Sequence, residues 1–392
     1  FGPEVGSGGA VYQPMYLTPE SYHRMKDSTK LLSRMSAGTP VSGNNMNLLP
    51  GPVDVCGEAV RAMSAHPVSH RSEELTAELG RVKSLLSSIT GARNVAVLMG
   101  SGTLANDALA AQLSLEEGEG IVLSNGEFGE RLVDHARRWG LSFDTVGKEW
   151  GKGFSREEIG EVIARNPGAP WLWAVHSETS TGVLNDAGML GELCAGSGIA
   201  LCLDCISSLG TVPVDLSRVY MATGTSGKGL RSYPGLSFVF HNHDIRSRPD
   251  KLPRYIDLGL YMESPGTPFT LSSNLLFALG ASLDGFRPEE RYARIRSLSA
   301  RLRGKLSDAG FDTVAERGHE APAIITIPLP ERLGSRVLGM RLERSGYYLN
   351  WRSDYLLERN WIQIALMGEC TEAGLEALVG LLSEEAKSRR RA

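Results

Sequence analysis

The chain has 392 residues, a length that favours two lobes over one compact core. Hydrophobic residues make up 42% and charged residues 22%, an ordinary composition for a globular protein. The net charge is −4, from 41 basic and 45 acidic residues, so neither a nucleic-acid surface nor an anionic-membrane surface is expected. No apolar run approaches the roughly 18 residues of a membrane span.

Residues 1–45 are rich in Gly, Ser and Pro and show little periodicity, which predicts an N-terminal arm or a loop region that packs on another subunit. The first ten residues lack the charged and apolar segments of a secretory signal. Five scattered cysteines exclude a disulfide framework and favour a reducing cytoplasm. Cys202 and Cys205 have a C-x-x-C spacing, but they lie in an apolar run that reads as a buried strand, where they would face opposite sides.

From about residue 54, helical stretches alternate with short apolar runs. Strands are expected at 94–100, 120–124, 170–176, 199–206, 220–223 and 236–241, and helices at 73–88, 104–115, 128–139 and 189–195. Runs that are apolar throughout indicate strands covered on both faces, and their alternation with helices indicates an α/β domain with a mostly parallel sheet. Ligands bind such sheets beyond the carboxyl ends of the strands, which places the chemistry in the loops after residues 100, 124, 176, 204 and 223.

The pattern changes after about residue 285. A charged helix at 288–306 is followed by a strand at 323–328, a helix at 331–344, strands at 347–351 and 361–367 and a final amphipathic helix. This order predicts a small α+β domain. The expected division is an arm at 1–45, a large α/β domain at 46–285 and a small C-terminal domain at 286–392.

Two residues favour chemistry on a flat cofactor. Lys228 lies in Ser226-Gly-Lys-Gly229 after an apolar strand, where small neighbours let the backbone approach a bulky ligand. Alone it reads more readily as a lysine in a surface turn. Asp204 ends an apolar strand, where a carboxylate is costly to bury unless it is paired. A protonated pyridine nitrogen would be such a partner, and the alternative role is a helix N-cap.

Three other segments end strands with polar or aromatic residues. Ser101-Gly-Thr103 opens a helix and offers backbone amides and hydroxyls to a phosphate, or simply caps that helix. Phe128 opens another helix and can stack on a planar ring, although a lone aromatic is more often a core residue. In His176-Ser-Glu-Thr-Ser-Thr-Gly182, the Ser180 hydroxyl can reach a ring oxygen of the cofactor. The eight histidines show no ligand spacing, so no metal is expected.

These segments, in this order, resemble the class V aminotransferases among the fold-type I pyridoxal 5′-phosphate (PLP) enzymes, most closely the alanine/serine–glyoxylate and 2-aminoethylphosphonate transaminases. The resemblance runs from about residue 47 to the last helix and adds Leu49-Pro-Gly-Pro52, His70-Arg-Ser72 and Ser207-Ser-Leu-Gly210. It implies a mostly parallel sheet with helices on both faces and a small C-terminal α+β lobe. It also implies a homodimer with shared active sites.

For the cofactor, the resemblance implies a Schiff base on Lys228 and a pyridinium partner in Asp204. It implies further cofactor contacts for a set of seven residues: Ser101, Gly102, Thr103 and Ser226 at the phosphate, Phe128 stacked on the ring, Ser180 at the ring hydroxyl and Ile206 under the ring. Thr267 would reach the phosphate of the partner subunit.

The substrate side departs from the family pattern. Gln363 stands where the family places an arginine that holds the substrate carboxylate, and glutamine carries no charge. Arg352 can replace that arginine from a neighbouring strand, or it can form a surface ion pair with Asp354 or Glu358. Gly51 is the third residue assigned to the substrate.

The expected activity is transfer of an amino group between a small amine or amino acid and a 2-oxo acid. In this hypothesis the Lys228 amine removes the α-proton of the substrate. An alternative is a PLP-dependent lyase or Cβ/Cγ-replacement enzyme, favoured by Gln363. A binding protein that has lost catalysis is disfavoured because Lys228 and Asp204 are both present. A dinucleotide-dependent dehydrogenase is disfavoured because no Gly-x-Gly-x-x-Gly turn follows the first strand.

Overall fold

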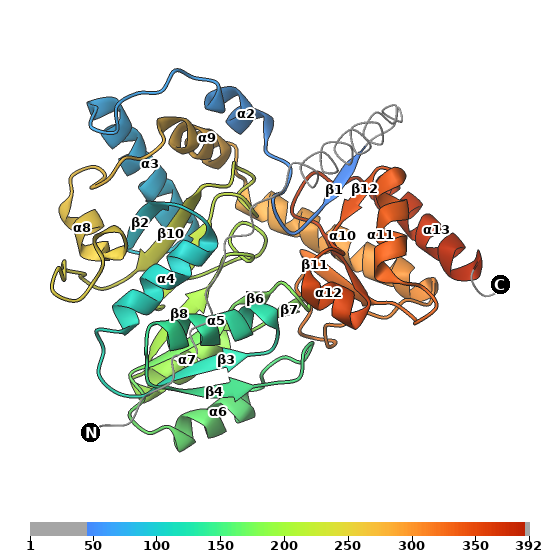
Figure 1. The fold of residues 1–392 in the computed structure, drawn as a ribbon, viewed down its shortest axis with the longest axis horizontal. Coiled ribbons are helices and arrows are strands. Elements are labelled where there is room, and N and C mark those ends of the chain that lie inside the picture. Colours follow the sequence, from blue (N-terminus) through green and yellow to red (C-terminus); the bar gives the residue numbers. More distant parts are fainter. Residues whose placement is uncertain (1–44, 389–392) are drawn as a thin grey trace, which may run out of the picture. The chain divides into compact units, whose positions relative to one another are not determined.

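The computed structural model describes residues 45–388, so the predicted N-terminal arm falls almost entirely outside the described residues. The centre of the fold is a seven-stranded sheet in the order β2-β10-β9-β8-β5-β3-β4 (Figure 1). Its strands are β2 (Asn94–Met99), β3 (Gly120–Ser124), β4 (Phe143–Gly147), β5 (Trp171–Val175), β8 (Ala200–Asp204), β9 (Met221–Thr225) and β10 (Leu236–His241). Strand β10 is antiparallel to both of its neighbours, and the other neighbouring pairs are parallel. The mostly parallel sheet predicted from the apolar runs is therefore confirmed.

Helices cover both faces of this sheet because successive strand residues point to opposite sides. Leu172 of β5 packs in one hydrophobic cluster and its neighbour Trp173 in another. The first face is covered by α3 (Glu73–Thr90), α6 (Arg156–Arg165), α7 (Ala187–Ser197) and α9 (Ser273–Asp284). The second face is covered by α4 (Gly102–Leu113), α5 (Glu127–Arg138) and α8 (Leu258–Glu263). Cys202 and Cys205 belong to these two different clusters, and both are free and buried, so the structural interpretation of this pair is confirmed.

Some elements escape the sequence prediction. Strand β4 lies at the edge of the sheet, and its residues are exposed or only partly buried, so it lacks the apolar run by which the inner strands were recognised. Helix α9 is apolar on nearly all sides because it packs against both α2 (Gly57–Met63) and α3. Such a segment lacks the polar face that marks a surface helix in a sequence.

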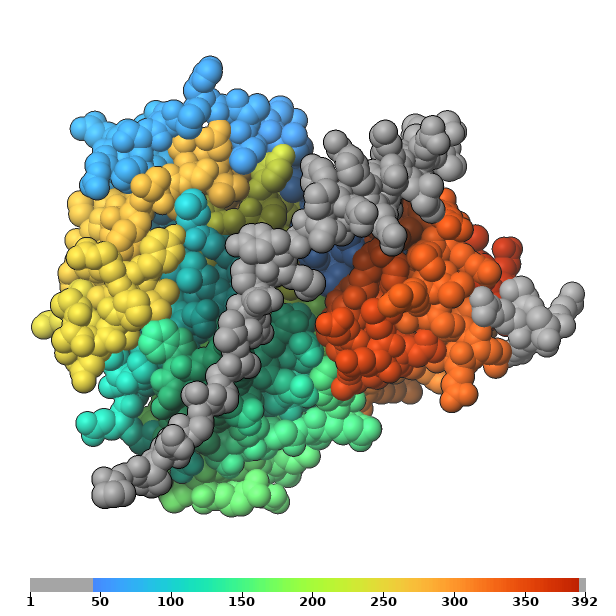
Figure 2. Space-filling model, viewed as in Figure 1, coloured from blue at the N-terminus to red at the C-terminus, as the bar shows by residue number. Residues whose placement is uncertain are grey.

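The C-terminal part forms its own hydrophobic cluster. It consists of α10 (Pro288–Asp308), β11 (Ile324–Pro328), α11 (Ser335–Arg344), β12 (Tyr347–Leu349), α12 (Asp354–Arg359), β13 (Trp361–Ala365) and α13 (Glu372–Ser388). In Figure 2 its orange and red surface lies on the right, beside the blue-to-yellow surface of the sheet-containing part. Strand β1 (Met46–Leu48) pairs with β12 although it precedes the large domain in sequence. The predicted domain boundaries at 45 and 285 stay predictions.

The topology brings five loops to one edge of the sheet, because the carboxyl ends of parallel strands meet there. The loops follow β2, β3, β5, β8 and β9, as the sequence predicts. One of them contains a short hairpin of β6 (Ser177–Glu178) and β7 (Val183–Leu184). Within residues 45–388, no helix has both the length and the apolar character needed to cross a membrane.

Candidate active site

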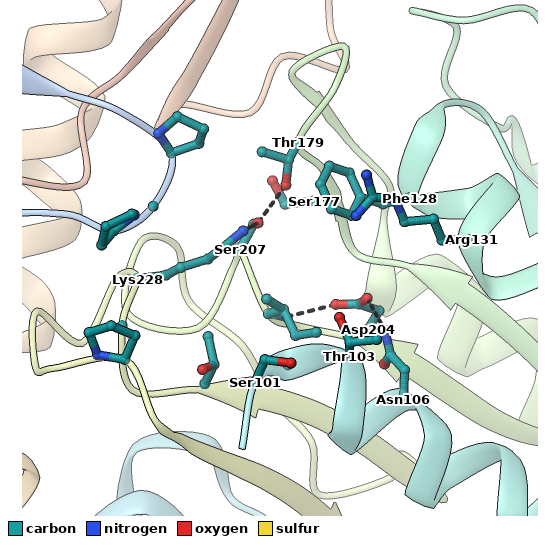
Figure 3. Close-up of a pocket in the computed structure, with 18 of the residues that line it drawn as sticks. Ser101, Thr103, Asn106, Phe128, Arg131, Ser177, Thr179, Asp204, Ser207 and Lys228 are labelled. Carbon is teal, nitrogen blue, oxygen red and sulfur yellow. Dashed lines mark hydrogen bonds between the residues drawn. The ribbon is translucent and has the colours of Figure 1, made fainter. Parts of the chain in front are cut away.

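A cavity of about 740 Å³ lies at this edge of the sheet. Residues that are distant in the sequence line it together: Gly51, Ser101, Gly102, Thr103, Phe128, Asp204, Ile206 and Lys228. All eight are residues to which the sequence analysis assigned a role at one site. Figure 3 shows the labelled members around a common space, with Ser101 and Thr103 at the start of a helix and Lys228 on the opposite side.

Lys228 enters the cavity from the loop after β9. Its Nζ donates a hydrogen bond to Ser207 Oγ at 3.0 Å and lies 5.5 Å from the centroid of the Phe128 ring. Ser207 in turn shares a hydrogen bond with the Thr179 hydroxyl (Figure 3). Burial lowers the pKa of Lys228 to about 8, although the nearby Asp204 carboxylate opposes this shift. The amine is therefore much more often neutral and nucleophilic at physiological pH than an ordinary lysine.

Asp204 is the last residue of β8 and is only 4% exposed. Its Oδ1 accepts a hydrogen bond from the backbone amide of Ile206 at 2.8 Å, and its Oδ2 accepts one from Asn106 Nδ2 at 2.8 Å. Burial raises the pKa of Asp204, while these hydrogen bonds and the charge of Lys228 lower it. Each oxygen keeps a further lone pair, so the carboxylate can accept another hydrogen bond from a ligand N–H group in the cavity.

The N-terminus of α4 faces the same space. Ser101 is the N-cap residue, but its side chain does not cap the helix, which leaves the hydroxyl available to a ligand. A Cβ at residue 102 would lie 2.6 Å from Cδ1 of Ile206, so glycine keeps this approach open. Amides and hydroxyls at a helix N-terminus form a suitable site for a phosphate group.

Phe128 lies in the first turn of α5, and Glu178 holds that turn in place. The buried Glu178 carboxylate accepts hydrogen bonds from the amides of Phe128 at 3.3 Å and Gly129 at 2.9 Å. It also accepts one from Ser180 Oγ at 2.6 Å. A carboxylate at a helix N-terminus is stabilised by the free amides and the helix dipole. The aromatic ring at the cavity is therefore positioned from the loop after β5.

Ser180 and Ser226, two predicted cofactor contacts, do not line the cavity, but the residue before each of them in the sequence does. Ser180 is fully buried and bonds Glu178, whereas its neighbour Thr179 lines the cavity. Ser226 Oγ donates to the Tyr233 carbonyl at 2.6 Å, whereas Thr225 lines the cavity. Ser180 and Ser226 lie in the turns that follow β6 and β9, where their side chains bond Glu178 and Tyr233 while the preceding residue lines the cavity.

Three further predicted residues are not among those lining the cavity. Arg352 is 62% exposed in its side chain, pairs with Glu343 at 2.7 Å and stacks on Trp351. Gln363 is fully buried, and its Nε2 donates to the Thr326 hydroxyl at 2.9 Å and to the Thr179 carbonyl. Thr267 Oγ1 donates to the Phe269 carbonyl at 2.9 Å. Arg352 is therefore held by a surface ion pair, but its partner is Glu343 and not the predicted Asp354 or Glu358.

Several residues for which the sequence predicted no role also line this site: Asn106, Arg131, His135, Thr179, Ser207, Thr225 and Tyr355. Asn106 carries little signal in the sequence, because the charged Asp107 stands beside it in the predicted helix. Arg131 lies one turn after Phe128, with its guanidinium carbon 4.8 Å from the centroid of that ring. His135 is bonded through Nδ1 to Asp107 at 2.7 Å.

The comparisons with known proteins agree with this geometry. The model of the aminotransferase class-V family matches residues 53–250. A 42 kDa soluble hydrogenase subunit from Anabaena cylindrica is 30% identical over 79% of this chain and 85% of its own length. The 2-aminoethylphosphonate–pyruvate transaminase of Pseudomonas fluorescens is 27% identical over 89% of this chain and 97% of its own length. A solved alanine–glyoxylate aminotransferase from Nostoc sp. superposes with a TM-score of 0.79 and 26% identity over 90% of this chain and 98% of that chain.

The chain belongs to the class V aminotransferases and is a PLP-dependent transferase of fold type I. The fold, the family and the cofactor expected from the sequence are thereby confirmed. The alternative of a lyase or a replacement enzyme is not favoured. The residues fit the cofactor, because one cavity offers a helix N-terminus for the phosphate, a buried carboxylate for the ring nitrogen and an amine for the aldehyde.

The lowered pKa of Lys228 gives a pH prediction. Only the neutral amine attacks an aldehyde, so the rate at which cofactor-free protein captures PLP should rise about tenfold per pH unit below pH 8. It should then level off above pH 8, whereas an ordinary lysine would continue to gain reactivity towards pH 10.5. Borohydride trapping at each pH, followed by peptide mapping of residue 228, measures this rate. A rate that still climbs between about pH 9 and 10 would contradict the shift.

Proposed function

We propose that this aminotransferase moves an amino group between a small amine or amino acid and a 2-oxo acid, with Lys228 as the residue that carries PLP as a Schiff base. When bound, PLP supplies an electron sink for the bonds around the substrate's amine-bearing carbon. The observation that carries the proposal is the convergence of a partly buried amine, Lys228, and a buried carboxylate, Asp204, on one cavity.

Lys228 is proposed to have two roles. It would hold the cofactor aldehyde in the resting enzyme, and its free amine would take a proton from the α-carbon of the substrate. A pKa of about 8 lets the same group accept and donate a proton near neutral pH. Ser207 and Thr179 orient the amine through their hydrogen-bonded hydroxyls.

Asp204 is proposed to face the ring nitrogen of the cofactor. An ionised carboxylate at this position favours the protonated nitrogen, which keeps the ring able to accept electron density. Ser101, Gly102 and Thr103 are proposed to hold the phosphate at the N-terminus of α4. Phe128 would cover one face of the ring and Ile206 the other, since both line the cavity.

The substrate's acidic group needs a cation, and the family's usual position is occupied by the uncharged and fully bonded Gln363. Of the arginines within residues 45–388, Arg131 is the one that lines the cavity. Its guanidinium pairs with Glu127 at 2.9 Å, yet 53% of its side chain remains exposed. We therefore assign substrate-anion binding to Arg131 rather than to Arg352, which Glu343 holds outside the cavity.

Lys228→Ala should abolish both the absorbance of the protein-bound Schiff base and turnover. The exposed Lys251→Ala variant is the matched control and should retain both. Incubation of the wild type with an amine donor alone should convert the cofactor to its aminated form, which remains on the enzyme. Turnover by Lys228→Ala would refute the proposal, and release of a keto product without the aminated cofactor would indicate elimination.

Arg131→Gln should raise KM for donors and acceptors that carry a carboxylate by about 10- to 100-fold, because a charged hydrogen-bond partner is lost. KM for an amine without an acidic group should change little. Arg352→Gln is the matched control, since it removes an equal charge outside the cavity. Steady-state kinetics with paired substrates decide the assignment, and an effect confined to Arg352→Gln would overturn it.

We also propose a homodimer, as the family resemblance implies, in which Thr267 of one subunit reaches the phosphate bound by the other. In the single chain Thr267 lies outside the residues that line the cavity, which is compatible with a role towards a second copy. Sedimentation of the purified protein should give the mass of a dimer at micromolar concentration. A monomer with full activity would exclude shared active sites.

We further propose that the protein is located in the cytoplasm. All five cysteines are free, and the four at 194, 202, 205 and 370 are buried. Free thiols throughout are typical of proteins that fold in a reducing compartment. Cell fractionation tests the location, and recovery of the protein from an oxidising compartment would contradict it.

A further inference from the structure

Three buried polar side chains from three different elements form a chain of hydrogen bonds that reaches the wall of the cavity. Thr223 lies on β9, Asn106 on α4 and Asp204 at the end of β8. Thr223 Oγ1 donates to Asn106 Oδ1 at 2.8 Å, and Asn106 Nδ2 donates to Asp204 Oδ2 at 2.8 Å. Thr223 is fully buried, and Asn106 and Asp204 are 5% and 4% exposed. Figure 3 shows the last of these bonds, with Asn106 directed from the helix towards Asp204.

The direction of each bond follows from the chemistry of the groups. An ionised carboxylate only accepts hydrogen bonds, so the amide must present its NH₂ end to Asp204. The two ends of an amide have nearly the same shape, and the Thr223 hydroxyl discriminates between them by donating to the oxygen. If the amide turned over, its oxygen would face the carboxylate and repel it. Thr223 therefore fixes the orientation on which the bond to Asp204 depends.

We propose that Asn106, oriented by Thr223, is a positioning residue that keeps the Asp204 carboxylate ionised and directed at the ring nitrogen of the cofactor. The inference rests on the proposed role of Asp204. It explains why an asparagine is buried in α4 beside Ala105, Ala108 and Leu109, which are fully buried.

The energetic need for such a residue comes from burial. Burial raises the pKa of Asp204, and a protonated Asp204 could not favour a protonated ring nitrogen. The Asn106 amide and the Ile206 amide each stabilise the charged form through one of the two carboxylate oxygens. Ile206 contributes through its backbone and cannot be removed by a side-chain change. Asn106 is thus the contact that mutation can test.

The test measures binding of two ligands to cofactor-free protein. One is PLP, and the other is its 1-deaza analogue, in which a carbon replaces the ring nitrogen so that no bond to Asp204 forms. Asn106→Leu, similar in shape, should lower PLP affinity by about 10- to 100-fold, because a hydrogen bond to a charged group is lost. Its affinity for the analogue should stay within about threefold of the wild type, because the analogue never used Asp204.

Thr223 supplies an independent pair of variants. Thr223→Val removes the hydroxyl and should lower PLP affinity by about 3- to 10-fold, as expected for one neutral hydrogen bond, again without a matching loss for the analogue. Thr223→Ser keeps the hydroxyl and should restore the wild-type preference. Thr90→Val is the matched control, since Thr90 is also buried but bonds the Leu86 carbonyl within α3 and does not line the cavity. It should leave the ratio of the two affinities unchanged.

The outcomes distinguish the positioning role of Asn106 from the proposed role of Asp204 at the ring nitrogen. A wild type that binds PLP and the analogue equally well would refute the role of Asp204 at the ring nitrogen. A wild type that prefers PLP, with Asn106→Leu and Thr223→Val showing the same preference, would overturn the positioning role alone. Equal losses for both ligands would indicate a general disturbance of the cavity and would also overturn it. If Asn106→Leu does not fold, the Thr223→Val and Thr223→Ser pair decides.

Discussion

The structure depends on the burial of a carboxylate at the carboxyl end of a central strand. Asp204 ends β8, which lies between β5 and β9, so its side chain is removed from water by the sheet and by α4. A buried carboxylate is unfavourable unless donors surround it. Asn106 and the Ile206 amide supply two such donors, and the cavity leaves room for a third group that carries a proton. The site is therefore arranged around the negative charge of Asp204, which a protonated ring nitrogen can neutralise.

Burial acts on Lys228 in the opposite sense. It disfavours the ammonium form, so the amine is available as a nucleophile and as a carrier of protons. Asp204 and Lys228 oppose each other's shifts, yet burial dominates in both cases. Because burial disfavours the charged forms of both Asp204 and Lys228, a ligand with charged groups of its own can stabilise these side chains by pairing with them. The helix N-terminus at Ser101 provides the matching site for an anion on that ligand.

The substrate side of the cavity differs from that expected of the family. Gln363 is a structural residue here, because its amide ties β13 to β11 and to the loop at Thr179. That loop also positions Thr179 at Ser207 and, through Glu178, the first turn of α5. Gln363, which the family resemblance places at the position of the substrate-binding arginine, thus stabilises a loop whose residue Thr179 lines the cavity. Recognition of an acidic substrate then falls to a residue on a different element, which we assign as Arg131.

The sequence by itself determined the inner strands, most of the helices and the loops that carry the site, because buried strands have apolar runs and the carboxyl ends of parallel strands must meet. It also placed Lys228, Asp204 and Ser101 together through the order of their motifs. The tertiary structure alone decided which of two neighbouring residues faces inward, as for Thr179 over Ser180, because both lie in the turn between β6 and β7, whose path depends on the bonds made by Glu178. It alone decided that Glu343 holds Arg352 and that Thr223 orients Asn106, because these pairs come from segments whose contact no local pattern encodes.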